Sequence, residues 1–413
     1  MQNTLITDDR VVTGILLVLV AVVFYTSQKQ HKYWKLFYTI FPSLLLCYLL
    51  PALFNSFNII SAETSGTYTF AKDYALPVAL VLLTLSIDMK GIRQLGSKSI
   101  IMFLAGTLGV VIGGPIAMGV FKFISPETVG GEGADATWRG LSTIAGSWIG
   151  GGANQAAMLE IYGYDQQKYG AMVLVDIVVA NIWMAVLLFG IGRSAKIDKW
   201  LNADTSAIEE LKVRVEENFK DKVRNPSLTD LMIILGFGFG ATALSHFLGA
   251  KLVEIISQTE SLKDSVINSH FFWVVVLATT FGLILSYTKA RNYEGAGASK
   301  IGGVMIYFLV ATIGMKMNIF EIFKYPGLFF VGLLWMAIHA SVMILVAKLI
   351  RAPFFFLAVG SKANIGGAAS APIVASAFHP SLAPVGVLLA VLGYALGTYG
   401  AIVCAEIMSK LAG

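Results

Sequence analysis

Long apolar runs alternate with short polar segments along nearly the whole chain. Ten of the runs approach the roughly 20 residues that a helix needs to cross a bilayer. They lie at about 11–27, 36–54, 74–88, 99–124, 169–192, 229–256, 270–287, 301–315, 327–350 and 384–408. Two further apolar stretches, 140–162 and 353–378, are interrupted by glycine clusters. The pattern predicts an all-α polytopic membrane protein.

Basic residues fall in alternate loops between the runs, and this predicts how the chain is oriented. Short loops rich in Lys and Arg face the cytoplasm. The polar segment 195–227 is basic at both ends and lies on the same side as the other basic loops only if 140–162 dips into the membrane and returns. We therefore expect 140–162 and 353–378 to be re-entrant hairpins. Helices that are broken midway but cross the membrane are the alternative.

The segment 195–227 is predicted to be a cytoplasmic linker that carries an amphipathic helix. Ser206 and Glu209 have capping-box spacing, and apolar residues then recur at intervals of three and four. Those apolar residues are Ile208, Leu211, Val215 and Phe219. A solvated charged linker is the alternative.

The two glycine clusters belong to an internal repeat. GSWIGGGANQAA, from Gly146, matches GSKANIGGAASAP, from Gly360, and a second pair of matching stretches ends at Lys90 and Lys316. With five spans and one hairpin each, the halves 11–194 and 228–411 would enter the membrane from opposite sides. Such inverted-topology repeats are found in many secondary transporters.

Composition and charge narrow the class of protein further. Of the 413 residues, 56% are apolar and 13% charged, and the mean hydropathy is +0.73, whereas a soluble domain has about 25% charged residues. The net charge of +5 resides mostly in the loops, so the expected partner is the lipid bilayer and not nucleic acid. Cys47 and Cys404 lie inside apolar runs, where we expect packing and no disulfide.

Polar side chains surround both glycine clusters and suggest a binding site. Hairpin tips at membrane depth leave backbone groups facing a cavity, where a helix N-terminus favours an anion and exposed carbonyl groups favour Na⁺. Small-residue packing and interhelical hydrogen bonds are the structural alternatives. The predicted substrate-binding residues are Ser147, Gly151, Gly152, Asn154, Gln155, Ser361, Lys362, Asn364, Gly366, Gly367 and Ser370.

Two charged residues inside the apolar segments, Lys362 and Asp176, are the strongest candidates for a role in binding. An ammonium at depth, such as Lys362, needs a carboxylate or an anionic substrate, unless the side chain reaches the cytoplasmic surface. Asp176 is the only acid in the fifth run and should be an ion ligand, a proton carrier or the partner of a cation. Local unwinding would bring Asn181 to the same site, and glycine spacing around Thr398 predicts unwinding in the tenth run. We assign Asp176, Asn181 and Thr398 to ion coupling.

The glycine-rich stretches GSWIGGGANQAAM and AVGSKANIGGAASAPIVA, with the C-terminal run GVLLAVLGYALGTYGAIVCAEI, resemble the bacterial and plastid membrane proteins of domain-of-unknown-function family 819. The resemblance covers nearly the whole chain. It implies the superfamily of cation/proton antiporters and anion transporters, which includes sodium/glutamate, sodium/citrate and bile-acid symporters. What the superfamily implies is a core domain that carries a ligand against a scaffold domain, with sodium or protons as the coupling ion.

The leading hypothesis is therefore a secondary transporter for a small anionic or zwitterionic metabolite. The hairpins with the fifth and tenth helices would form a mobile core, and the first, second, sixth and seventh helices a scaffold. A cation/proton antiporter is the alternative within transport, followed by an intramembrane enzyme or a passive channel. We expect no enzymatic activity and no cofactor beyond Na⁺ at the coupling residues. The expected location is a bacterial inner membrane, and a homodimer is left open.

Overall fold

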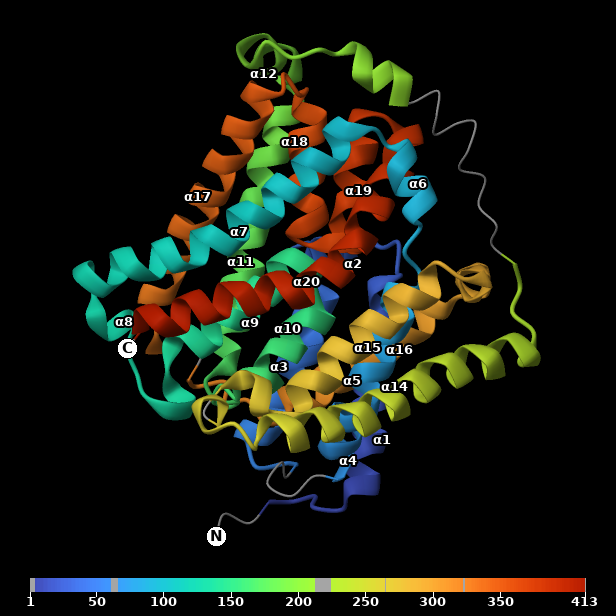
Figure 1. Ribbon diagram of the computed structural model, residues 1–413, viewed down its shortest axis with the longest axis vertical. Coiled ribbons are helices and arrows are strands. Elements are labelled where there is room, and N and C mark those ends of the chain that lie inside the picture. The colour runs from blue at the N-terminus through green and yellow to red at the C-terminus, as the bar shows by residue number, and fades with distance from the viewer. Residues whose placement is uncertain (1–3, 61–65, 212–223, 264, 322–323, 413) are drawn as a thin grey trace.

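The computed structural model describes residues 4–60, 66–211, 224–263, 265–321 and 324–412 (Figure 1). Within these ranges the regular structure is helical, apart from an isolated bridge between Ile6 and Ile60. The predicted all-α fold is thus confirmed.

Seven described helices are long and apolar enough to cross a membrane. They are α1 (Asp9–Ser27), the continuous stretch Gly66–Leu85, α7 (Ser97–Ile124), α11 (Tyr169–Ile191), α14 (Leu228–Ile256), α17 (Gly327–Leu349) and the segment Pro380–Ala412, which contains α20 (Ala383–Ala412). Two bent pairs, α2 (Lys32–Ile40) with α3 (Ser43–Ser56) and α15 (His270–Ser286) with the short helix Lys289–Ala296, raise the number to nine. The remaining predicted run, 301–315, corresponds to the shorter α16 (Ala298–Gly314).

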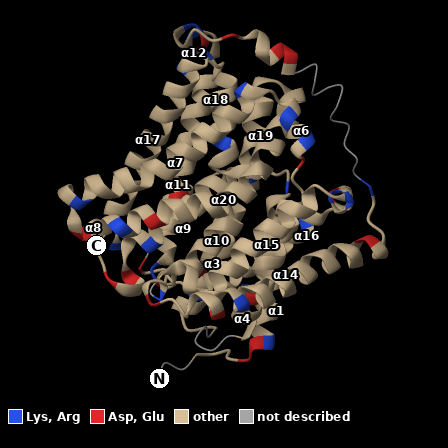
Figure 2. Ribbon diagram, in the orientation of Figure 1, with Lys and Arg blue, Asp and Glu red and all other residues tan. Residues whose placement is uncertain are grey.

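Charged residues gather toward opposite ends of the molecule, and the helices between them are almost free of charge (Figure 2). Ion pairs join elements at these ends. Lys98 pairs with Asp204 at 2.9 Å, and Lys168 with Asp135 at 2.7 Å. An apolar belt between two charged ends is the distribution that a bilayer requires, and the chain is an integral membrane protein.

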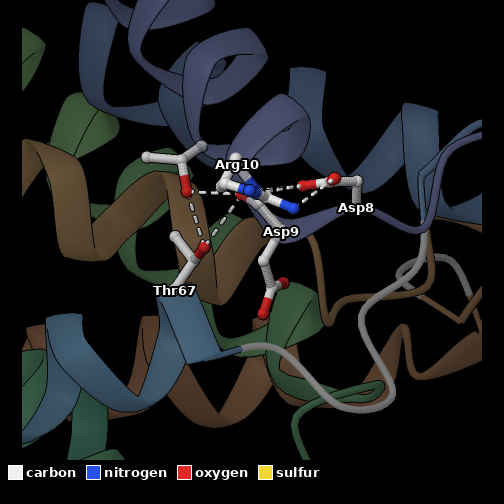
Figure 3. A network of polar contacts seen from close by, with 5 residues as sticks. Asp8, Asp9, Arg10 and Thr67 are labelled. Atoms are coloured by element: carbon white, nitrogen blue, oxygen red, sulfur yellow. Dashed lines mark hydrogen bonds and ion pairs between the residues drawn. The ribbon is translucent and has the colours of Figure 1, made fainter.

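The start of α1 is fastened to α4 (Gly66–Phe70), the first helix of the Gly66–Leu85 stretch (Figure 3). Asp8 caps α1 by accepting a hydrogen bond from the backbone N–H of Arg10 at 2.8 Å. The hydroxyl groups of Thr13 and Thr67 are 2.6 Å apart, and Gly66 donates its backbone N–H to Asp9 at 2.7 Å. A π-helical turn, Ala71–Ala75, joins α4 to α5 (Leu76–Leu85).

The helices pack as two groups. In the scaffold group, α5 lies against α14, α15 and α16, and α3 lies against α1 and α16. In the core group, α7 packs along α17, and α20 packs along α9 (Thr137–Gly150) and α19 (Gly367–Phe378). α10 (Gly152–Tyr162), α11 and α18 (Phe354–Asn364) complete the core group. The inverted relation of the halves 11–194 and 228–411 stays a prediction.

The described part of the 195–227 segment attaches to the core group. It begins with α12 (Ser194–Leu201), whose Asp198 accepts the backbone N–H of Phe354 at the start of α18 at 2.7 Å. Residues 206–211 are helical, whereas Val215 and Phe219 of the predicted amphipathic helix lie outside the described residues.

Candidate functional site

Each glycine-rich stretch is a pair of helices in which the chain turns back. The first pair, α9 and α10, breaks at Gly151, whose φ of +77° favours glycine. Trp138 at the start of α9 and Tyr162 at the end of α10 are in ring contact, with centroids 5.3 Å apart. The ends of the pair therefore lie together, as in a hairpin.

The second pair, α18 and α19, has the same form. It breaks at Ile365 and Gly366, and the φ of Gly366 is +102°. Phe355 near the start of α18 contacts Phe378 at the end of α19, with ring centroids 5.3 Å apart. A broken helix that continued in one direction would place these two rings far apart.

The tips of both hairpins lie against one stretch of α20. A Cβ atom added to Gly393 would lie 2.6 Å from the carbonyl oxygen of Ile149 and 3.7 Å from that of Ala363. One added to Gly397 would lie 2.5 Å from the Cα atom of Gly150. The expectation that α20 unwinds is wrong, because α20 is a continuous helix. Its glycines instead allow the hairpin backbones to approach closely.

Asp176 of α11 reaches the tip of the first hairpin, where three side chains donate to its carboxylate. Ser147 and Trp148 donate at 2.7 Å each and Gln155 at 3.0 Å. Asp176 is only 5% exposed, and the side-chain oxygen Oε1 of Gln155 is buried without a partner among the described residues. The carboxylate thus has orienting donors, but no ion pair within the described ranges.

Lys362 lies at the tip of the second hairpin and is 2% exposed, so it does not extend to the cytoplasmic surface. Its ammonium donates to the carbonyl oxygen of Ala180 on α11 at 3.4 Å. A Cβ atom on Gly366 would lie 3.1 Å from the Lys362 Nζ and would also collide with the Ser370 hydroxyl. That hydroxyl is buried and has no partner in the described part of the chain. Lys362 and Ser370 therefore flank the N-terminus of α19.

Ser361 takes part in a hydrogen-bonded chain that ties α18 to its neighbours. Trp183 donates to the Ser361 hydroxyl at 2.8 Å, and that hydroxyl lies 2.8 Å from His339 Nε2. His339 Nδ1 lies 3.1 Å from the carbonyl oxygen of Gly106, which accepts only, so the pattern assigns the proton to Nδ1. Ser361 then donates to Nε2, and every group in the chain is satisfied.

Two asparagines predicted to bind substrate have structural partners. Asn154 donates to the backbone carbonyls of Gly150 and Tyr394 at 3.0 and 3.1 Å and accepts from Thr398 at 2.6 Å. Asn364 donates to Phe103 and Gly360 at 2.9 and 3.0 Å and accepts from Thr107 at 2.8 Å. With both amide hydrogens engaged, these residues fasten each hairpin to α20 or α7.

The remaining predicted residues are the glycines of the two clusters and two residues assigned to ion coupling. Gly151 and Gly152 border the first break, and Gly366 and Gly367 the second. Asn181 is exposed on an unbroken α11, and Thr398 bonds to Asn154 and Thr279, at 2.6 and 3.1 Å. The structure therefore does not bring either residue to Asp176.

Sequence reasoning missed Trp148 and Trp183, whose indole N–H groups orient Asp176 and Ser361. The sequence offered one indication for Trp148, which directly follows Ser147 in the first repeated cluster. His339 is a buried histidine whose two ring nitrogens both have hydrogen-bond partners.

Comparison with known proteins adds a family to this geometry. Residues 14–411 match a family model described as a protein of unknown function, DUF819. The chain belongs to this family. It is also similar to the uncharacterized membrane protein YjcL of Bacillus subtilis, with 25% identity over 362 residues that cover 84% of this chain and 85% of that protein. The relative is thus also a membrane protein, and neither match names an activity.

Proposed function

We propose that the protein is a secondary active transporter that moves a small anionic or zwitterionic metabolite by alternating access. The observation that supports this most directly is a pair of buried charges at the two hairpin tips. The carboxylate of Asp176 lies at the first tip and the ammonium of Lys362 at the second, and the two do not form an ion pair. Buried charges of this kind are expensive unless they meet a counter-charge. Cargo and coupling ion would give each charge a direct partner, which the attraction between the two separated side chains does not.

Asp176 would bind the coupling ion. Its two oxygens accept three hydrogen bonds, and a carboxylate has about four lone-pair positions, which leaves room for a cation. The unpartnered Oε1 of Gln155 adds a second oxygen of the type that Na⁺ prefers. A proton on the carboxylate would meet the same need.

Lys362 would bind the anionic group of the substrate. Its ammonium and the Ser370 hydroxyl flank the N-terminus of α19, where backbone N–H groups and the helix dipole favour negative charge. Ser147 and Gln155 would complete the site from the first hairpin. Asn154, Ser361 and Asn364 would hold the hairpin backbones in place.

The grouping of the helices suggests an elevator-like motion. Both tips, Asp176 and Lys362 belong to the core group, which could move as one body past the scaffold group. One polar contact between the groups joins the hydroxyl of Thr280 on α15 to that of Tyr399 on α20, at 2.8 Å. A cation/proton antiporter is the second candidate, since Asp176 alone would suffice for exchange of cations.

Hydrolytic chemistry is less well supported than transport. Ser361 and His339 are in contact, but both side chains are fully buried and the Ser361 oxygen also accepts from Trp183.

A bacterial inner membrane is the proposed location.

A thermal-shift screen of the purified protein tests the proposal. Each member of a panel of amino acids, hydroxy acids and dicarboxylates is added in NaCl and in KCl, at two pH values. A ligand at 100 times its Kd stabilises the folded state by about 2.7 kcal/mol. We expect a stabilising metabolite whose effect depends on Na⁺ or pH. If no anionic or zwitterionic compound stabilises the protein under any of these conditions, the proposal fails.

A further inference from the structure

A second carboxylate, which the proposed mechanism does not use, lies at the boundary between the core and scaffold groups. Glu160 is near the end of α10, at the base of the first hairpin, and is partly buried. Its Oε1 accepts a hydrogen bond from the Tyr68 hydroxyl and another, at 3.3 Å, from the side-chain amide of Gln166. Gln166 also contacts the Tyr68 hydroxyl.

The partners of this cluster come from different groups of helices. Glu160 and Gln166 belong to the first hairpin and the loop that follows it. Tyr68 lies on α4 of the scaffold group, and the ammonium of Lys316, just after α16, sits 3.7 Å from the centre of the Tyr68 ring. Lys72 and Asp73 of the π-helical turn complete the charges that act on Glu160. The cluster thus joins the two groups through charged and aromatic side chains.

We propose that Tyr68 and Glu160 form a latch that holds the core group against the scaffold group in the conformation seen here. The proposal rests on the transport function, because the latch has a purpose only if the core group moves. Motion of the core would separate the carboxylate from its phenol donor and from the nearby Lys316, and would leave it to water. Hydrogen bonds to charged groups are among the strongest in proteins, so the latch biases the equilibrium between two transport states.

The chain contains a matched control for this contact. The Tyr162 hydroxyl donates to Glu406 at 3.0 Å, which is the same phenol-to-carboxylate chemistry. Both residues belong to the core group, since Tyr162 is on α10 and Glu406 on α20. Loss of the Tyr162 hydroxyl therefore weakens packing within the core group without loosening it from the scaffold group.

A cysteine pair next to the latch reports the position of the core. The backbone N–H of Asn318, in the segment held by α3, donates to the carbonyl oxygen of Gln167 at 3.2 Å. Asn318 is placed on the scaffold side by contacts such as that of Asn55 with the Met317 carbonyl, at 3.3 Å. Cysteines at 167 and 318 therefore lie within the range for a disulfide. The native Cys47 and Cys404 are both buried.

The experiment measures the rate of oxidative cross-linking in the full-length Gln167→Cys/Asn318→Cys protein, reconstituted in lipid nanodiscs. Tyr68→Phe should slow cross-linking by roughly tenfold, the factor expected when a hydrogen bond to a charged group is removed. Glu160→Gln should have a smaller effect in the same direction, and Tyr162→Phe should leave the rate within about twofold.

Equal rates in Tyr68→Phe and the parent would overturn the latch. Equal slowing by Tyr68→Phe and Tyr162→Phe would also overturn it, because a general loss of stability would then explain both. Neither result would contradict the transport proposal, which is tested by measuring substrate uptake. Absence of gradient-driven uptake in the parent would instead contradict the transport role. The cross-linking rates would still report whether Tyr68 and Glu160 hold the two groups of helices together.

Discussion

The ammonium of Lys362 lies 3.4 Å from the carbonyl oxygen of Ala180, one helical turn beyond Asp176 on α11. Asp176 belongs to α11 and contacts the tip of the first hairpin, whereas Lys362 contacts the same helix from the tip of the second hairpin. The positions on α11 that they mark, 176 and 180, are about 6 Å apart along the helix axis. Each has polar neighbours, and no ion pair joins them in the described part of the chain. Each charge therefore reaches α11 by its own polar contacts, close to the other charge along the helix.

Replacement of Asp176 tests the coupling site. Asp176→Asn keeps the size of the side chain and part of its hydrogen bonding, so we expect a folded protein whose stability no longer responds to Na⁺ and responds less to pH than that of the parent. Thermal denaturation in NaCl and in KCl measures this response. A variant that responds to both ions and pH as the parent does would exclude Asp176 from coupling.

Replacement of Lys362 separates an anion carrier from a cation exchanger. Lys362→Gln removes the charge and should lower substrate affinity tenfold or more, whereas Lys362→Arg keeps the charge with a different geometry and should retain part of the affinity. Binding calorimetry with a ligand from the screen measures both. Unchanged affinity in Lys362→Gln would make the lysine a structural residue.

Gly393 tests the close approach of α20 to the first hairpin. In Gly393→Ala the new Cβ atom would lie 2.6 Å from the carbonyl oxygen of Ile149, and overpacking of this kind costs about 1–3 kcal/mol. Gly240→Ala on α14 is the control, because no atom lies within 4 Å of its added Cβ. We expect thermal denaturation to show a destabilised Gly393→Ala and a neutral or slightly stabilised Gly240→Ala. Equal stability of the two variants would contradict the packing described here.

Asp198 tests the cap of the second hairpin. Burial raises the pKa of its carboxyl group, so the ionised form is less favourable in the folded protein, and stability gained from this group increases as the pH falls. Asp198→Asn keeps an oxygen for the Phe354 N–H without a charge and should be at least as stable as the parent at neutral pH. Asp198→Ala should lose about 1 kcal/mol. A similar loss in both variants would show that the cap depends on the charge.

The sequence predicted the helices well because apolar runs of spanning length have few other interpretations. It also predicted that Asp176 would be buried, since a lone acid in such a run must avoid lipid. It did not predict the donors to Asp176, because Trp148 and Gln155 are 28 and 21 residues away along the chain. The spacing of Gly393 and Gly397 led to the wrong prediction that the tenth run unwinds. The same glycine pattern can allow a helix to unwind or allow another helix to pack closely against it.

The hairpin asparagines show the same limit. An amide beside a glycine cluster can bind a ligand or a backbone carbonyl group, and only the positions of Tyr394 and Phe103 show that Asn154 and Asn364 do the second. These partners lie on other helices, more than 200 residues away along the chain. No local pattern in the sequence records such a contact.

Uptake into proteoliposomes is the direct test of secondary active transport by this protein. Radiolabelled compounds that stabilise the protein in the thermal screen are presented outside vesicles with an imposed Na⁺ or proton gradient, using the parent and Asp176→Asn. We expect saturable uptake in the parent that ends when the gradients are dissipated, and none above empty vesicles in Asp176→Asn. Uptake in the parent that neither saturates nor depends on either gradient, or equal uptake in Asp176→Asn, would contradict it.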